Sequence, residues 1–135
     1  MQPFVINYLA LLVAAVVKFF IGFVWFTLLF GKKWAAIQGI TPGPDNKAVM
    51  TRGMIIDFVG GLVTAFVLVH ATHYAGATGW WQGAAVGFFN WLGFMAVTTL
   101  STITWEKRPY TLWVINNAYS LVYLVAMGVI VTVWT

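Results

Sequence analysis

The sequence predicts an all-α integral membrane protein, in which one domain over residues 1–135 forms a bundle of four transmembrane helices. Hydrophobic residues make up 61% of the chain and charged residues only 7%, whereas roughly a quarter of a soluble domain is charged. The chain also contains four apolar runs, each longer than the roughly 20 helical residues that cross a hydrocarbon core of about 30 Å. Strands of a membrane β-barrel alternate in polarity over about 10 residues, so these continuous runs are predicted to be helices.

The four spans are predicted over residues 4–30, 53–75, 79–103 and 110–134. The connection over residues 31–52 is the longest, and a short amphipathic turn around Trp34 and Ile37 is expected there at the membrane surface. Pro44 suits the first turn of a helix, so the second helix is expected to begin before its apolar run. The connections around residues 74–79 and over 104–109 are short, and Pro109 fits the start of the fourth helix.

The basic residues predict the orientation of the chain. Six of the seven lysines and arginines, all but Lys18, fall in two connections, with Lys32, Lys33, Lys47 and Arg52 in the first and Lys107 and Arg108 in the third. The positive-inside rule places both connections in the cytoplasm. We therefore expect both termini on the outer, periplasmic side of the cell inner membrane. Lys32, Lys33, Lys107 and Arg108 also lie where anionic lipid headgroups bind, although topology alone accounts for them.

The composition gives little support to several classes of function. The absence of Cys excludes disulfides and thiolate metal sites. With three acidic residues, no Gly-rich phosphate loop and no paired carboxylates, we expect neither an enzyme nor a cofactor. The net charge of +4 reflects topology and does not indicate nucleic-acid binding. His70 and His73 lie one turn apart at the outer end of the second span, where interfacial histidines are favoured over a metal or haem site because further ligands are lacking.

Lys18 is the most informative residue, because it falls near the middle of the first span. A charge there costs about 2.5–3.5 kcal/mol on insertion scales. At a rise of about 1.5 Å per residue, Asn90 lies at a similar depth, whereas Asp57 and Asn116, with Asn117 beside it, lie nearer the cytoplasmic end. Lys18 and Asp57 differ by about 12 Å in depth on the same count, so a direct pair requires Lys18 to snorkel or a helix to tilt.

Two interpretations of these polar residues stay open. In the functional one, Lys18 faces a wet or anion-binding cavity that Asn90 and Asp57 help to line. In the structural one, Lys18 pairs with a carboxylate or with backbone carbonyls, and Asn90, Asn116 and Asn117 form hydrogen bonds between helices.

Small residues predict where helices approach each other closely. Gly83 and Gly87 form a G-x-x-x-G pair in the third span. Gly22 and Gly61 lie on the polar stripes of the first and second spans. From these positions we expect close packing between the second and third helices.

Several short words of the sequence resemble those of a known family. They include FGKKW at residues 30–34, WEKRP at 105–109 and INNAY at 115–119. Together they extend over nearly the whole chain, which is similar to the small bacterial membrane proteins catalogued as domain of unknown function 1761. The resemblance implies four membrane helices and supplies no activity. The family pattern commonly has an acidic residue at the position of Asn116 and no Lys at position 18, which implies that a role of Lys18 is particular to this chain.

Two classes of function remain. A bundle of this size has little interior of its own, so we expect a homo-oligomer in the lipid bilayer. The first class is permeation or transport of a small solute or ion through a polar layer around Lys18. The alternative is a non-catalytic accessory or assembly subunit of a larger membrane complex.

Overall fold

The computed structural model describes residues 5–39 and 47–134, and these ranges are mostly helical and contain no strand. Four segments are long and apolar enough to cross a membrane: Tyr8–Leu29, Met50–Tyr74, Trp80–Thr104 and Tyr110–Val133. The predicted all-α fold with four candidate spans is thereby confirmed, and it is compatible with a multi-pass membrane protein. The elements in chain order are α1 (Tyr8–Phe23), η1 (Val24–Leu29), α2 (Gly31–Gln38), α3 (Lys47–Tyr74), α4 (Trp80–Trp91), η3 (Leu92–Ala96), η4 (Thr98–Leu100), α5 (Ser101–Thr104) and α6 (Tyr110–Val133).

Two expectations concern the connection between the first two spans. The short turn expected around Trp34 is part of α2, which ends where Gly39 adopts a left-handed conformation with φ 70°. Helix α3 already begins at Lys47, ahead of its apolar run. Pro44, which suggested that early start, lies outside the described residues.

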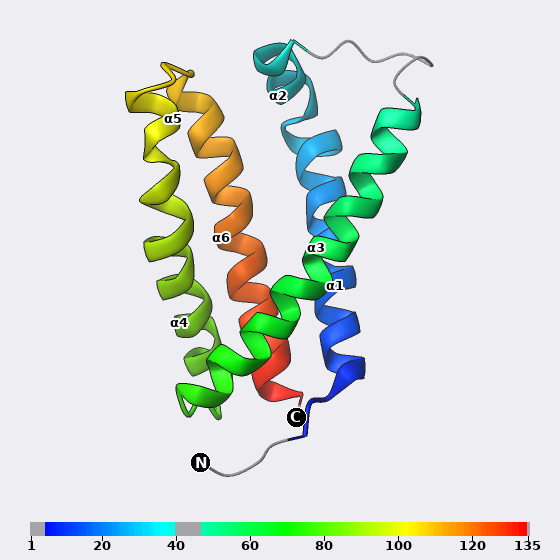
Figure 1. Ribbon diagram of the computed structural model, residues 1–135, viewed down its shortest axis with the longest axis vertical. Coiled ribbons are helices and arrows are strands. Elements are labelled where there is room, and N and C mark those ends of the chain that lie inside the picture. The colour runs from blue at the N-terminus through cyan, green and yellow to red at the C-terminus, as the bar shows by residue number, and fades with distance from the viewer. Residues whose placement is uncertain (1–4, 40–46, 135) are drawn as a thin grey trace.

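The two ends of the bundle differ (Figure 1). One end, called the basic end below, carries α2, α5 and the loop over residues 105–109. The opposite end, called the terminal end, carries the start of α1, the end of α6 and the turn between α3 and α4. Helix α6 packs against both α1 and α4, and α3 runs obliquely past them. Helices α3 and α6 therefore approach each other near the terminal end and diverge toward the basic end.

The apolar core lies in the terminal half of the bundle. It consists of buried side chains from α1, α3 and α6: Leu11, Ala14, Ala65, Leu68, Tyr123, Leu124, Met127 and Val131. Asn7 closes this half, because its side chain accepts a hydrogen bond from the Ala10 amide and donates one to the Trp134 carbonyl. In the basic half, by contrast, residues 50–56 of α3 are exposed wherever their side chains are described. The bundle is thus packed at one end and open at the other.

The closest helix approach joins α4 to α6, which corrects the expectation of close packing between the second and third helices. A Cβ added at Gly83 would clash with the Gly128 carbonyl oxygen, and one added at Gly87 would lie 2.7 Å from the Leu124 carbonyl carbon. The G-x-x-x-G pair therefore meets a glycine and a backbone segment of the fourth span. The motif marks a close approach, but its partner depends on which helix presents a matching small residue, and that residue is Gly128.

Two spans contain a π-helical segment that the sequence analysis did not predict. Segment η1 follows α1 and η3 follows α4, and the Phe30 amide donates to the Trp25 carbonyl five residues earlier. Such segments shift the helix register by one residue and are frequent at functional sites. A tryptophan within η1 and another directly before η3 donate their indole N–H groups to α6, Trp25 to the Ile115 carbonyl at 3.0 Å and Trp91 to the Asn117 carbonyl at 2.8 Å. Hydrogen bonds from the first and third spans therefore reach α6 at nearly the same height along its axis.

Candidate functional site

The candidate site is a charged centre between α1, α3 and α6. Lys18 lies in α1, near the middle of the candidate span Tyr8–Leu29, and is 6% exposed. Its Nζ donates to Asp57 Oδ1 of α3 at 3.0 Å and to the Tyr119 hydroxyl of α6 at 3.4 Å. Three helices that are distant in sequence thus meet at one ammonium group.

Two tyrosine rings of α6 complete the surroundings of Lys18. Its Nζ lies 4.7 Å from the ring centroid of Tyr123 and 5.7 Å from that of Tyr119. An ammonium over an aromatic face is attracted by the ring quadrupole, by about 2 kcal/mol when the group is desolvated. The buried charge is therefore satisfied by one carboxylate, one hydroxyl and two rings.

Two of the predicted packing glycines make room for this centre. A Cβ added at Gly61 would lie 3.4 Å from Lys18 Cδ, and one added at Gly22 would lie 2.9 Å from the Tyr119 hydroxyl oxygen. Gly61 lets the lysine stem pass along α3, and Gly22 lets the tyrosine reach α1. These glycines of the first and second spans therefore shape the charged centre, while Gly83 and Gly87 join α4 to α6.

The two charged partners differ strongly in exposure. The Lys18 side chain is 8% exposed and the Asp57 side chain 44%. The pairing overcomes the depth difference of about 12 Å that straight, upright helices would give, because α3 is inclined across the bundle (Figure 1). The same inclination carries the basic half of α3 away from α6, so that part of the carboxylate is left uncovered.

The asparagines do not join this centre. Asn90 donates to the Val86 carbonyl of its own helix, and α4 packs mainly on α6, so no described contact joins Asn90 to Lys18 in spite of their similar predicted depth. Asn117 is buried, accepts a hydrogen bond from Thr99 and donates to the Trp113 carbonyl. It thus links the third and fourth spans, as the structural interpretation expected of it.

Asn116 and Arg108 line a separate cleft of about 610 Å³ at the basic end, between α2, the end of the third span and the first turns of α6. Arg108 Nη2 donates to Gln38 Oε1 at 2.5 Å across this end. Lys107 lies in the same loop with a left-handed φ of 55°, and Lys32 and Lys33 lie exposed on α2. The cleft is a second polar site, distinct from the charged centre.

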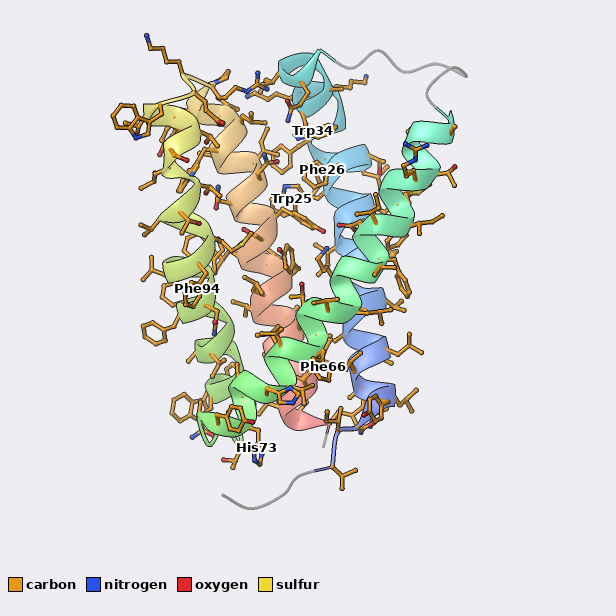
Figure 2. All side chains as sticks on the ribbon, in the orientation of Figure 1. Trp25, Phe26, Trp34, Phe66, His73 and Phe94 are labelled. Carbon is orange, nitrogen blue, oxygen red and sulfur yellow. The ribbon has the colours of Figure 1, made fainter. Side chains whose placement is uncertain are left out.

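The histidines lie at the terminal end, where Figure 2 labels His73. His73 lines a small pocket of about 150 Å³ together with Asn7, Thr72 and Thr132. His70 Nδ1 lies 2.8 Å from the Phe66 carbonyl oxygen. Within residues 5–39 and 47–134, no group of three or more His, Cys, Asp or Glu side chains forms a candidate metal site.

Tyr119 is the site residue that sequence reasoning missed, and Trp25 packs beside it. Figure 2 shows the Trp25 side chain of η1 pointing toward α6, and its ring centroid lies 6.4 Å from that of Tyr119 with the two rings tilted by 41°. Tyr119 and Tyr123 are spaced by four residues on α6, so they follow the same stripe as Asn116. That spacing was the available signal, but an aromatic residue in an apolar span also fits lipid contact.

Comparison with known proteins places the whole bundle in one family. No curated protein and no solved structure matches the chain. A family model, described as protein of unknown function (DUF1761), matches residues 9–132, which include all of the charged centre and the cleft at the basic end. The chain therefore belongs to the family of proteins of unknown function DUF1761.

Proposed function

We propose that this protein passes a small solute or ion across a membrane, and that the charged centre of Lys18 and Asp57 lies on its path. The observation that carries the proposal is the uncovered carboxylate of Asp57, 44% exposed within a candidate membrane span. Ionisable residues inside a membrane mark ion and substrate pathways more often than not. No catalytic role is included in the proposal.

The exposed part of Asp57 needs a polar environment. A carboxylate that faces hydrocarbon loses its hydration without compensation, which costs several kcal/mol even after local relaxation, on the order of the values for intramembrane charges. The oblique course of α3 opens the bundle toward the basic end, where residues 50–56 of α3 have no buried side chain among those described. We infer that water enters from the basic end and reaches Asp57.

A small cation is the solute class that fits this centre best. The uncovered charge is negative, whereas the positive partner is sealed behind Tyr119 and Tyr123. Lys18 then acts as a tethered cation that a mobile cation displaces from Asp57. Between the charged centre and the terminal end, the apolar core that includes Leu11, Leu68 and Met127 closes the path. The arrangement is therefore one state of a pathway, open on one side and closed on the other.

The orientation and location belong to the same proposal. The positive-inside rule puts the basic end in the cytoplasm and both termini on the outer side of a cell inner membrane. The opening of the bundle then faces the cytoplasm.

A second candidate is a non-catalytic accessory or assembly subunit, and the saturation of the polar groups favours it. Lys18 makes four contacts with three residues, and Asn117 is bonded within the bundle. A polar side chain of a second copy or of another membrane subunit then covers Asp57. The two candidates differ in one property, since water reaches Asp57 only in the first.

Flux through the purified protein in liposomes tests the first candidate. We expect uptake of a monovalent cation that is lost in Lys18→Met and in Asp57→Asn, provided that both variants are recovered in the membrane. Ile56→Ala is the matched control, because Ile56 is adjacent to Asp57 and 64% exposed. Flux that persists in both charge variants removes the centre from the pathway.

A further inference from the structure

The cleft at the basic end has the size of a small-molecule site. Its volume of about 610 Å³ falls within the roughly 300–1,000 Å³ that such sites occupy. It lies between the end of α2, the loop that follows α5, and the first turns of α6. Its lining is mostly polar: Gln38, Thr99, Thr102, Glu106, Arg108, Leu112, Trp113, Asn116 and Asn117.

The cleft presents one negative and one positive side chain that do not pair with each other. Glu106 and Arg108 both line it, but they form no ion pair together. The backbone holds them in place, because the Glu106 amide donates to the Ser101 carbonyl at 3.1 Å and the Arg108 amide to the Thr102 carbonyl at 2.8 Å. Lys107 between them takes the left-handed φ of 55°, which is costly for a residue with a Cβ. The loop is thus bent so that the residues on either side of Lys107 reach the cleft.

Trp113, another residue that lines the cleft, carries a buried donor without a partner among the described residues. Among the residues that the structure describes, Trp113 Nε1 is buried and has no hydrogen-bond acceptor. An indole N–H can only donate, and a buried donor left unsatisfied costs about 1–3 kcal/mol. Arg108 uses one of its N–H groups on Gln38 and keeps others available. The remaining N–H groups of Arg108 and the indole N–H of Trp113 are therefore donors that could bind an acceptor on a ligand.

We infer that the cleft binds a small zwitterion, with its oxyanion on Arg108 and the Trp113 indole and its ammonium on Glu106. The Asn116 and Gln38 amides surround the ligand with neutral polar groups. A ligand with both charges leaves the cleft neutral, whereas an anion alone would face Glu106 unfavourably. This chemistry occurs in a free α-amino acid and in an ethanolamine phospholipid headgroup. The inference does not depend on transport through the charged centre.

Calorimetry on the purified full chain in an uncharged maltoside detergent tests this inference. One arm titrates glycine, glutamine and phenylalanine, and a second arm titrates dihexanoyl phosphatidylethanolamine. Saturable heat in the first arm identifies an amino acid, and saturable heat in the second arm alone identifies the lipid headgroup. Absence of saturable heat in both arms overturns the inference.

Substitutions of residues that line the cleft test whether those side chains contact the ligand or only maintain the structure. We expect Arg108→Gln to weaken binding about tenfold or more, and Arg108→Lys, which keeps the charge, to weaken it less. Glu106→Gln should weaken the zwitterion while leaving or strengthening the binding of the same molecule without its amine. Lys107→Gln is the matched control, since Lys107 is in the same loop but does not line the cleft. Equal losses in Lys107→Gln and Arg108→Gln, or equal effects of Glu106→Gln on both ligands, contradict the assignment.

Trp113→Phe adds a readout that a purely structural role would not give. It removes a buried donor that has no partner among the described residues, so the unliganded protein should lose no thermal stability. Ligand binding should nevertheless weaken. A variant that unfolds more easily and binds unchanged would show that the indole N–H does not face the ligand.

Discussion

Asp57 pairs with Lys18 at 3.0 Å, yet its side chain is 44% exposed while that of Lys18 is 8% exposed. The lysine is enclosed by α1, α3 and α6, whereas the carboxylate lies where α3 turns away from α6. An ion pair with one sealed and one open member differs from a fully buried pair, because something outside the bundle can compete for the open member. This asymmetry makes the pair a candidate for function.

The asymmetry predicts unequal costs for removing the two partners. Asp57→Asn leaves a sealed ammonium without its carboxylate, and we expect a destabilisation approaching the about 3–5 kcal/mol of a broken buried pair. Lys18→Met leaves a carboxylate that remains partly exposed, so its cost should be about 1–3 kcal/mol. Unfolding of both variants in the same detergent measures the difference.

The double variant Lys18→Met with Asp57→Asn is the control for this comparison. Because no unpaired charge remains, it should regain much of the stability that Asp57→Asn loses. Equal costs for the two single variants, or a larger cost for Lys18→Met, would contradict the asymmetric burial of the pair.

The close approach of α4 and α6 predicts that Gly87→Ala destabilises the bundle. The added methyl would lie 2.7 Å from the Leu124 carbonyl carbon, and overpacking of this kind costs about 1–3 kcal/mol. Gly93→Ala is the matched control in the same span, because no described atom beyond its helix neighbours lies within 4 Å of an added Cβ. The control should be neutral or slightly stabilising in thermal unfolding. A neutral Gly87→Ala would mean that α4 does not pack on α6 through this glycine.

The two tryptophan hydrogen bonds to α6 predict similar, moderate losses. Trp25→Phe and Trp91→Phe each remove an indole donor, and each should cost about 0.5–1.5 kcal/mol. Trp105→Phe should stay within about 0.5 kcal/mol, since Trp105 is 82% exposed. Thermal unfolding of the three variants checks the ranking, and a loss in Trp105→Phe as large as in the other two would count against the role of α6 carbonyls.

The charge distribution predicts the topology. A reporter enzyme that is active only in the cytoplasm should be silent when fused after Thr135 and active when inserted between Lys107 and Arg108. The opposite pattern would show that the basic end faces outward, and the proposed opening toward the cytoplasm would then be wrong.

The number of spans followed from the sequence because it depends on local composition. An apolar run has to exceed about 20 residues to cross the membrane, and each of the four predicted runs overlaps one candidate span along most of its length. The early start of α3 at Lys47 was equally local, since it depended on helix-start residues.

The relations between helices were harder to predict, because they depend on shape. The G-x-x-x-G pair indicated a close approach, but only the fold shows that Gly128 is opposite Gly83. The depth count assumed upright helices, so it separated Lys18 from Asp57, which the inclined α3 brings together. The segments η1 and η3 add a residue to one turn and leave no trace in apolar periodicity. Tyr119 was missed because an aromatic residue in an apolar span fits both lipid contact and a charged site.

Water access beside Asp57 is the most direct test of the proposed pathway, and the absence of native Cys makes it clean. Gly60→Cys lies about one turn deeper than Asp57 on the same side of α3, keeps the ion pair, and has open space for its side chain among the described atoms. Val59→Cys lies within about 2 Å of the same depth but about 160° around the helix from Asp57, and Val59 is 52% exposed. A small, membrane-impermeant methanethiosulfonate reagent applied from the side of the basic end should label Gly60→Cys rapidly and Val59→Cys hardly at all. Labelling of neither cysteine, or of both at the same rate, would contradict a water-filled path to the charged centre.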